Sequence, residues 1–247
     1  MRNVRFWMLA AVLAMAGGGK GISRTQQGNV DVLHTEEGEL KIRPILHGSL
    51  MLEFRGKIIH VDPWSQGTYA GLPKADLILI TDIHPDHMDR AMVDQLKKET
   101  TVILAPAAVA ETIREARVIR NGERKTVDGI TVEAVPMYNL VRGPSPGQLY
   151  HTKGRGNGYV LTLGGKRVYI SGDTECVPEI KALKGIDVAF ICMNLPFTMP
   201  PEEAAECVKA FRPKIVYPYH YRNSDLNIFV NALKDESGIE VRVRSWY

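Results

Sequence analysis

A continuous apolar run that leads straight into a cluster of ionisable residues is the feature that most constrains this chain. Residues Asp76–Thr81 read DLILIT, a composition typical of a β-strand that is buried on both faces. Such a strand needs neighbours in its own sheet and packed layers above and below it, so the chain must build a layered fold. The run continues without a break into Asp82-Ile83-His84-Pro85-Asp86-His87-Met88-Asp89.

Short apolar segments separated by turns and helices follow the same scheme in both halves of the chain. Strands are expected at Leu40–Leu46, Gly48–Phe54, Lys57–Asp62, Asp76–Thr81, Val102–Leu104, Ile130–Pro136, Gly158–Leu163, Arg167–Ser171, Val188–Met193 and Lys214–Pro218. Helices are expected at Met88–Lys98, Ala107–Glu115 and Glu202–Phe211, and a final helix and strand close the chain. Two sheets packed face to face with helices outside would bury all these apolar faces, so we expect an α/β (α+β) fold.

The N-terminal residues differ from the rest. Arg2 and Arg5 precede the apolar run Phe6–Ala16, which ends in small residues, as secretory signal peptides do. The run is shorter than the roughly 20 apolar residues that a membrane span needs, so no stable span is expected after cleavage. Residues 17–38 are Gly-rich and polar, as in a linker. We therefore expect a signal peptide and linker over residues 1–22, a single domain over residues 23–247, and an exported, periplasmic or secreted protein. The alternative is a frayed N-terminus, or a start codon assigned too early, on a cytoplasmic protein.

Charge and cysteine content narrow the class of protein. A net charge of +3 on 247 residues is too small and too evenly spread for a nucleic-acid-binding surface. The three cysteines, Cys176, Cys192 and Cys207, have no zinc-finger spacing and cannot all pair within the chain. We expect them to be buried apolar side chains, and their odd number argues mildly against an oxidising compartment.

The loop after strand Asp76–Thr81 carries four potential metal ligands in six residues. Imidazole and carboxylate side chains at a spacing of two or three residues can converge on one ion. The simpler interpretation is a solvated loop that caps the next helix, with Asp86 or Asp89 at the N-cap. The four candidate ligands are Asp82, His84, Asp86 and His87.

Two further strand ends deliver residues of the same kind. Asp173 follows strand Arg167–Ser171, and His220 follows strand Lys214–Pro218. Either residue alone would be an ordinary turn or packing residue, but three strand ends that each carry a ligand indicate one site at a sheet edge. Among the remaining histidines, His34, His47 and His60 lack comparable partners, and His60 is expected in the core or on the surface of a strand.

The run Asp82–His87 resembles the H-x-H-x-D-H motif of the metallo-β-lactamase superfamily. The resemblance extends from about Lys41 to Tyr247, includes Asp62-Pro63, and is greatest to the L-ascorbate-6-phosphate lactonase-like branch of uncharacterised hydrolases. It implies a four-layer αββα sandwich. The sequence departs from the family pattern at the first motif position, where Asp82 replaces a histidine. It departs again after strand Ile130–Pro136, where no histidine follows and His151 is the best substitute.

The same resemblance implies a metal-dependent hydrolase with two divalent ions. One ion would take His84, His151 and Asp82, and the other Asp86, His87 and His220, with Asp173 as the bridge. Zn²⁺ is the first candidate; the extra carboxylate favours Mn²⁺ or Fe²⁺, and a single-metal enzyme is an alternative. A metal-bound hydroxide would cleave a small ester, lactone, amide or phosphoester, with Asp86 and Asp173 as catalytic residues.

The substrate is expected to be a small molecule, with an anionic group as one possibility. Pocket-lining residues expected on this basis are Tyr138, Asn139, Lys153, Arg155, Asn157 and Tyr221, although the Gly-rich segment 153–157 could equally be a solvated surface loop. The alternatives to hydrolysis are a non-catalytic member that binds a metal or ligand, and an iron-dependent oxidoreductase. Neither nucleic acid nor a β-lactam antibiotic is expected as the substrate.

Overall fold

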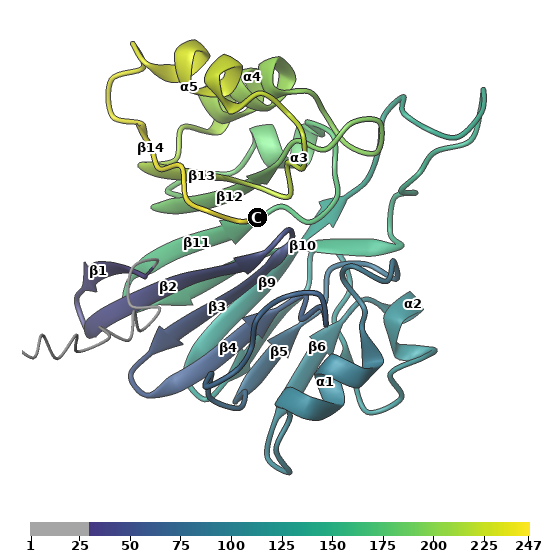
Figure 1. Cartoon of the computed structure of the whole chain (residues 1–247), viewed down its shortest axis with the longest axis vertical. Helices are drawn as coiled ribbons and strands as arrows, with labels where there is room; N and C mark the ends of the chain where they lie inside the picture. Colours follow the sequence, from purple (N-terminus) through teal and green to yellow (C-terminus); the bar gives the residue numbers. More distant parts are fainter. Residues whose placement is uncertain (1–29) are drawn as a thin grey trace, which may run out of the picture.

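Two seven-stranded sheets packed face to face form the centre of the molecule, which the computed structural model describes over residues 30–247 (Figure 1). The expected signal peptide lies outside the described residues. The first sheet contains, in spatial order, β1 (Asp31–Thr35), β2 (Gly38–Leu46), β3 (Ser49–Phe54), β4 (Lys57–Val61), β5 (Leu77–Leu79), β6 (Val102–Ala105) and β7 (Arg117–Val118). Strands β1 to β4 pair in antiparallel fashion, and β4 to β7 in parallel fashion.

The second sheet repeats this plan. It contains β8 (Arg124–Val127), β9 (Ile130–Met137), β10 (Gly156–Leu163), β11 (Lys166–Ile170), β12 (Val188–Cys192), β13 (Ile215–Tyr219) and β14 (Glu240–Val241), again in spatial order. Strands β8 to β11 are antiparallel, and β11 to β14 are parallel. The fully buried sequences of β5 and β12 are covered on both faces, as their apolar composition predicts.

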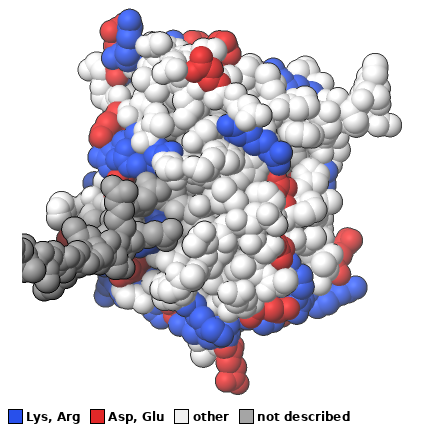
Figure 2. All heavy atoms as spheres, viewed as in Figure 1, with Lys and Arg blue, Asp and Glu red and all other residues white. Residues whose placement is uncertain are grey.

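The helices cover the outer faces of the two sheets, which confirms the four-layer αββα sandwich (Figure 1). Helices α1 (Arg90–Leu96) and α2 (Ala107–Ala110) pack on the first sheet. Helices α3 (Pro178–Lys181), α4 (Pro201–Phe211) and α5 (Leu226–Leu233) pack on the second. In the part of the chain that the structure describes, no helix is long and apolar enough to cross a membrane. On the face shown in Figure 2, basic and acidic side chains are interspersed and the described residues form no continuous basic band.

Two element predictions need correction. The segment 17–38, expected to be a linker, contains strand β1, which pairs with β2 and is anchored by Asp31. The Asp31 carboxylate accepts hydrogen bonds from the Tyr217 hydroxyl (2.5 Å) and from Arg244 Nε (3.0 Å). Helix α2 ends at Ala110 instead of Glu115, because the residues that follow form separate turns.

The cysteines also differ from expectation, because Cys176 and Cys207 form a disulfide while Cys192 remains a buried free thiol. The disulfide joins the segment that follows β11 to helix α4. The loop 171–177 is therefore fixed to the outer helical layer by a covalent bond.

Candidate metal centre

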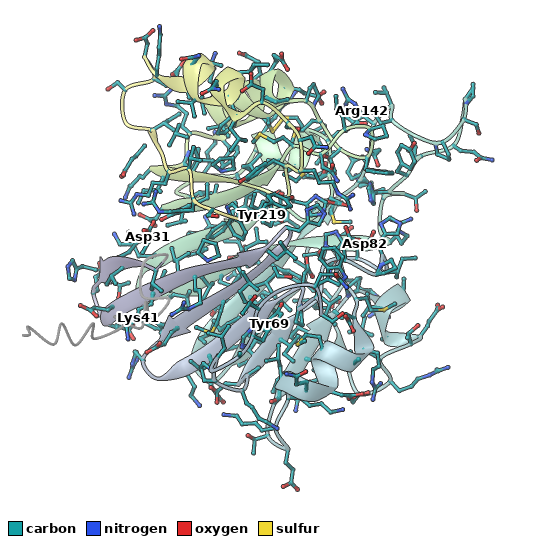
Figure 3. The ribbon with its side chains drawn as sticks, in the orientation of Figure 1. Asp31, Lys41, Tyr69, Asp82, Arg142 and Tyr219 are labelled. Atoms are coloured by element: carbon teal, nitrogen blue, oxygen red, sulfur yellow. A yellow bond between two sulfur atoms is a disulfide. The ribbon has the colours of Figure 1, made fainter. Side chains whose placement is uncertain are left out.

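The expected ligands meet at one edge of the sandwich because they follow parallel strands. Asp82 lies just beyond β5, Asp173 beyond β11 and His220 beyond β13, and the carboxyl ends of parallel strands point to the same edge. Figure 3 labels Asp82 and Tyr219, which mark this edge on the first and second sheets. The β9–β10 loop, residues 138–155, projects beside it and brings in His151 (Figure 1).

Three imidazole rings surround the Asp173 carboxylate. His87 Nε2 lies 3.4 Å and His151 Nε2 3.3 Å from Oδ2 of Asp173, and His220 Nε2 lies 3.4 Å from Oδ1. All four side chains are buried. The three Nε2 atoms and Asp173 Oδ1 have no hydrogen-bond partner, although they lie inside the protein.

This arrangement fits a metal ion. An unpartnered buried polar atom is costly, so three such imidazole nitrogens around one buried carboxylate need an explanation, and those of His87 and His220 fall in one candidate metal group with Asp173. Ligand atoms about 2.0–2.1 Å from a tetrahedral zinc ion are roughly 3.3–3.4 Å apart, which matches the observed separations. The donor set of imidazole nitrogen and carboxylate oxygen is also the one that zinc and neighbouring transition metals bind.

The opposite ring nitrogens of two of these histidines are held by hydrogen-bond acceptors. His87 Nδ1 lies 2.8 Å from Asp62 Oδ2, and His151 Nδ1 lies 2.7 Å from Asn139 Oδ1. Asp62 is itself fixed by the backbone N–H of Thr81 at 2.7 Å. Because Nδ1 donates its proton to these oxygens, Nε2 is left free as a ligand in both rings.

Asp82, His84 and His151 form one flank of the centre, called here the Asp82 side. Asp82 is buried, and its Oδ2 lies 3.0 Å from His84 Nδ1 and 3.8 Å from His151 Nε2. Arg155 donates two hydrogen bonds to the same carboxylate, one to each oxygen. Burial would raise the pKa of Asp82, but the hydrogen bonds from His84 and Arg155 lower it to about 2.

Asp86, His220 and His47 form the other flank, called here the Asp86 side. Asp86 Oδ2 lies 3.0 Å from His47 Nε2 and 3.5 Å from His220 Nε2, and the rings of His47 and His220 stack with centroids 3.6 Å apart. The expectation that His47 has no comparable partners is therefore wrong. The sequence signal for His47 is the glycine that follows it, Gly48 in the β2–β3 turn, because a glycine lets this turn approach the site closely. A Cβ on Gly48 would lie 3.1 Å from the His220 ring.

A hydrogen-bond chain fixes the proton on His47. The backbone N–H of Arg222 donates to the Tyr247 hydroxyl oxygen at 2.9 Å, and that hydroxyl contacts His47 Nδ1. With its oxygen already accepting, the hydroxyl is free to donate its proton to Nδ1. His47 Nε2–H then donates to Asp86, so His47 orients this carboxylate and does not need to act as a ligand. Burial lowers the pKa of His47 to about 4, which keeps the ring neutral.

The buried charges at the centre favour a cation. Burial would raise the pKa of Asp173, but His220 and His87 hold it well below its ordinary value. Burial would lower the pKa of His87, but the Asp173 and Asp62 carboxylates raise it well above its ordinary value. The carboxylates thus stabilise positive charge at this point, which a divalent ion supplies as well as a proton does.

A cavity of about 210 Å³ opens on Asp86 and Asp173. Tyr150 and Phe197 form its apolar wall, with ring centroids 5.1 Å apart. Its other lining residues are His84, Pro85, Asn194 and Arg222. The Arg222 side chain is half exposed, and its Nη2 lies 4.0 Å from Asp86 Oδ2.

The six residues expected to line the pocket are absent from the lining of this cavity. Tyr138 and Lys153 both contact Glu179, through a hydroxyl bond of 3.0 Å and an ion pair of 2.5 Å. Asn157 is buried, and its Nδ2 donates to the Ile119 carbonyl. The remaining three also contact protein groups: Asn139 holds His151, Arg155 pairs with Asp82, and Tyr221 packs on Tyr247.

The remaining polar residues of the motif region have structural roles. Asp89 is the N-cap of helix α1 and accepts a hydrogen bond from the Met92 N–H at 3.1 Å. His60 is buried in β4, where its Nε2 contacts the Pro73 carbonyl at 3.0 Å, as expected for a core histidine. His34 is exposed on β1.

Comparison with known proteins shows the family to which this fold belongs. The family model described as "Beta-lactamase superfamily domain" matches residues 41–220, so the chain belongs to the β-lactamase superfamily of metal-dependent enzymes. Within that superfamily it belongs to the UPF0173 metal-dependent hydrolases. A UPF0173 member from Symbiobacterium thermophilum is 30% identical over 220 residues, which cover 83% of this chain and 92% of that protein.

Solved structures agree with this assignment. The crystal structure of a protein assigned as a metal-dependent hydrolase from Parabacteroides distasonis is 44% identical, with a TM-score of 0.82, and the match covers 87% of this chain and 98% of that one. Igni18, a metallo hydrolase from Ignicoccus hospitalis, shares the fold at 24% identity, with a TM-score of 0.69 and coverage of 83% and 95%. The protein is thus a metal-dependent hydrolase of the metallo-β-lactamase fold.

Proposed function

We propose that the enzyme hydrolyses a small ester, lactone, amide or phosphoester at the centre around Asp173. The observation that carries this proposal is the convergence of three unpartnered imidazole nitrogens on one buried carboxylate. Among these substrates, a phosphorylated lactone would agree with the resemblance to the L-ascorbate-6-phosphate lactonase-like branch.

The residues that would hold an ion are His87, Asp173 and His220, with Asp86 at one flank and Asp82, His84 and His151 at the other. Zn²⁺ suits the three imidazoles best, and Mn²⁺ or Fe²⁺ would gain from the added carboxylates. A bound divalent ion would lower the pKa of a coordinated water to about 7 and polarise the bond to be cleaved.

Asp86 would orient the attacking water and accept its proton. Its carboxylate is 20% exposed and faces the cavity, while Asp173 is almost fully buried. His47 holds Asp86 Oδ2 from the protein side, so Oδ1 is the oxygen that is free to meet water. Tyr150 and Phe197 would exclude bulk water from the same cavity, which strengthens electrostatic interactions inside it.

The position of Arg222 in the cavity favours a substrate that carries an anionic group. Arg222 is the one cationic side chain in the lining of the cavity, and its contact with Asp86 is long enough for a carboxylate or phosphate to compete. An Arg222→Met variant should raise KM for anionic substrates roughly 10- to 100-fold, because a hydrogen bond to a charged group contributes about 1.5–3 kcal/mol. Neutral esters should keep their KM; an equal effect on both substrate types would exclude this role.

The test of the proposed hydrolysis is an Asp173→Asn variant assayed on a panel of esters, lactones and phosphodiesters. The variant should lose both metal binding and turnover, because the carboxylate touches all three imidazoles. Asp187→Asn is the matched control, since Asp187 forms ion pairs with Lys214 and Lys166 away from the centre. Turnover retained by Asp173→Asn would refute the proposal.

Export of the protein is a further part of the proposal. The Cys176–Cys207 disulfide supports it, because disulfides persist in oxidising compartments such as the periplasm. Cell fractionation with N-terminal sequencing should find the mature protein outside the cytoplasm and cleaved after the apolar run Phe6–Ala16. Full-length protein in the cytoplasm would contradict export.

A further inference from the structure

The two flanks of the centre differ in how their carboxylates are neutralised. On the Asp86 side, the carboxylate contacts two histidines, and its nearest arginine nitrogen is the Nη2 of the half-exposed Arg222 at 4.0 Å. On the Asp82 side, the carboxylate carries a close and directional partner, because Arg155 Nε lies 3.0 Å from Oδ1 and Nη2 lies 2.7 Å from Oδ2.

Backbone carbonyls of the same loop fix the position of Arg155. Its Nη1 donates to the Tyr150 carbonyl at 2.8 Å, and its N–H donates to the Thr152 carbonyl at 3.2 Å. Gly156, the next residue, begins β10, and a Cβ there would lie 2.2 Å from the Met137 side chain and 2.8 Å from the Thr81 carbonyl. Strand β10 therefore begins in close contact with Met137 and Thr81, and the guanidinium of Arg155, one residue earlier, faces Asp82.

The ion pair of Arg155 with Asp82 occupies both carboxylate oxygens that an ion on the Asp82 side would need as ligands. Both oxygens of Asp82 accept hydrogen bonds from Arg155, and Oδ2 also lies 3.0 Å from His84 Nδ1. In contrast, His87, Asp173 and His220 each present an unpartnered buried atom. His151 belongs to the Asp82 side, and its unpartnered Nε2 lies 3.3 Å from Asp173 Oδ2. The donor atoms that lack partners thus gather around Asp173, and none of them belongs to Asp82.

Charge acts in the same direction as the hydrogen bonds. The Arg155 side chain places a cationic guanidinium beside the buried Asp82. Asp82 and Arg155 together add no net charge, whereas Asp173 offers its carboxylate to an ion beside His87 and His220, and Asp86 contacts the same His220. A second divalent ion at the Asp82 side would meet a neutralised ligand and a fixed positive charge.

We propose that Arg155 is a built-in counter-ion that replaces a second metal ion, so that the chain binds one ion tightly, at His87, Asp173 and His220. The inference rests on the metal centre of the proposed function and deepens it, because it sets the number of ions. The substitution of Asp82 for the usual histidine is then understandable: a carboxylate is the side chain that holds a guanidinium by two parallel hydrogen bonds.

The test is the metal stoichiometry of the full-length protein, with Co²⁺ as the probe. Metal-free protein is titrated while the visible absorbance of bound Co²⁺ is followed, and elemental analysis of the dialysed protein gives the ion count. The wild type should saturate at one equivalent. Arg155→Met should bind a second equivalent at least tenfold more tightly than the wild type does, because Asp82 then becomes an available anionic ligand.

Two further variants make the test decisive. Lys153→Met removes a cation from the same loop, one that pairs with Glu179, and should leave the stoichiometry at one. Asp82→His combined with Arg155→Met avoids an unpaired buried carboxylate, so it tests the inference if Arg155→Met does not fold; it should bind two ions. Two tightly bound ions in the wild type, or one ion in both Arg155 variants, would overturn the inference and leave the hydrolase proposal intact. Absence of tight binding in every protein would overturn the metal centre itself.

Discussion

At the scale of single residues, the centre depends on side chains that hold other side chains. Asn139 and Asp62 fix the rings of His151 and His87 from behind, and the Tyr247 hydroxyl and His47 fix Asp86. Partners of this kind set the tautomer and orientation of a ligand, so their removal changes metal binding without removing a ligand.

The first residue-scale prediction concerns Asn139. An Asn139→Ala variant should bind Zn²⁺ roughly 10- to 100-fold more weakly, because His151, whose Nε2 lies 3.3 Å from Oδ2 of the ligand Asp173, loses the acceptor that fixes its ring. Competition with a chromophoric chelator measures the affinity. Asn157→Ala is the control, since Asn157 is also a buried asparagine but its amide contacts the Ile119 carbonyl. Equal affinity losses in both variants would show a general loss of structure instead.

The second residue-scale prediction concerns Tyr247. A Tyr247→Phe variant removes the donor to His47 Nδ1, so the His47 proton is no longer directed to Asp86. We expect kcat to fall roughly tenfold with KM nearly unchanged, as for other groups that orient a catalytic residue indirectly. The control is Tyr221→Phe, which removes the hydroxyl of a neighbouring ring whose centroid lies 5.0 Å from that of Tyr247. This variant should retain the wild-type kcat. The same kcat in wild type and Tyr247→Phe would contradict a role for the hydrogen-bond chain from Tyr247 through His47 to Asp86.

How far the sequence predicts such residues depends on their distance from the motif. The run Asp82–His87 and the strand-end residues Asp173 and His220 were predicted because each follows a recognisable strand. His47 was not, because it lies 39 residues before Asp86 and reaches it only when the β2–β3 turn closes over the second sheet. The pocket residues were misjudged for a similar reason, since the path of loop 138–155 depends on tertiary contacts such as those of Glu175 with the backbone at 140–142.

At the scale of elements, buried strands were easier to predict than the short edge elements. β5 and β12 carry continuous apolar runs and appear where that pattern predicts them. Neither β1 nor β7 contains a buried residue, and both depend on pairing with β2 and β6, which no local pattern shows. The disulfide was missed because Cys176 and Cys207 are separated by 31 residues and meet only after α4 packs on its sheet.

The disulfide gives a prediction at this scale. A Cys207→Ser variant should lower the free energy of unfolding by roughly 3–4 kcal/mol, the entropic estimate for a closed loop of about 30 residues. Denaturant unfolding measures the change, and a Cys192→Ser variant, whose thiol is free, is the comparison. Unfolding free energies that agree within error for wild type and Cys207→Ser would contradict a stabilising disulfide between Cys176 and Cys207.

Thiol counting checks the same link in the wild type. Burial raises the pKa of the Cys192 thiol to about 12, so the native protein should show no reactive thiol at pH 8. After denaturation, one thiol per chain should react without reductant, and three with it. Three reactive thiols in the absence of reductant would show that Cys176 and Cys207 are not joined.

At the scale of the whole molecule, the metal centre joins the two sheets. His87 follows the first sheet, whereas Asp173 and His220 follow strands of the second, so a bound ion would tie the halves together at one edge. Removal of metal by a chelator should therefore lower the melting temperature, by roughly 5–10 °C at a metal concentration of 100 Kd, where binding contributes about 2.7 kcal/mol. Calorimetry measures the shift, and re-addition of Zn²⁺ should reverse it. An unchanged melting temperature would mean that no ion links the sheets.

The proposed hydrolysis depends on the position of the bound ion, and anomalous X-ray diffraction measures this position directly. Crystals soaked with Zn²⁺ and recorded on both sides of the zinc absorption edge should show a strong peak enclosed by His87 Nε2, Asp173 and His220 Nε2. The Asp82 side should show little or no density. A peak at any other position, or none among these three residues, would contradict the metal centre on which the proposed hydrolysis depends.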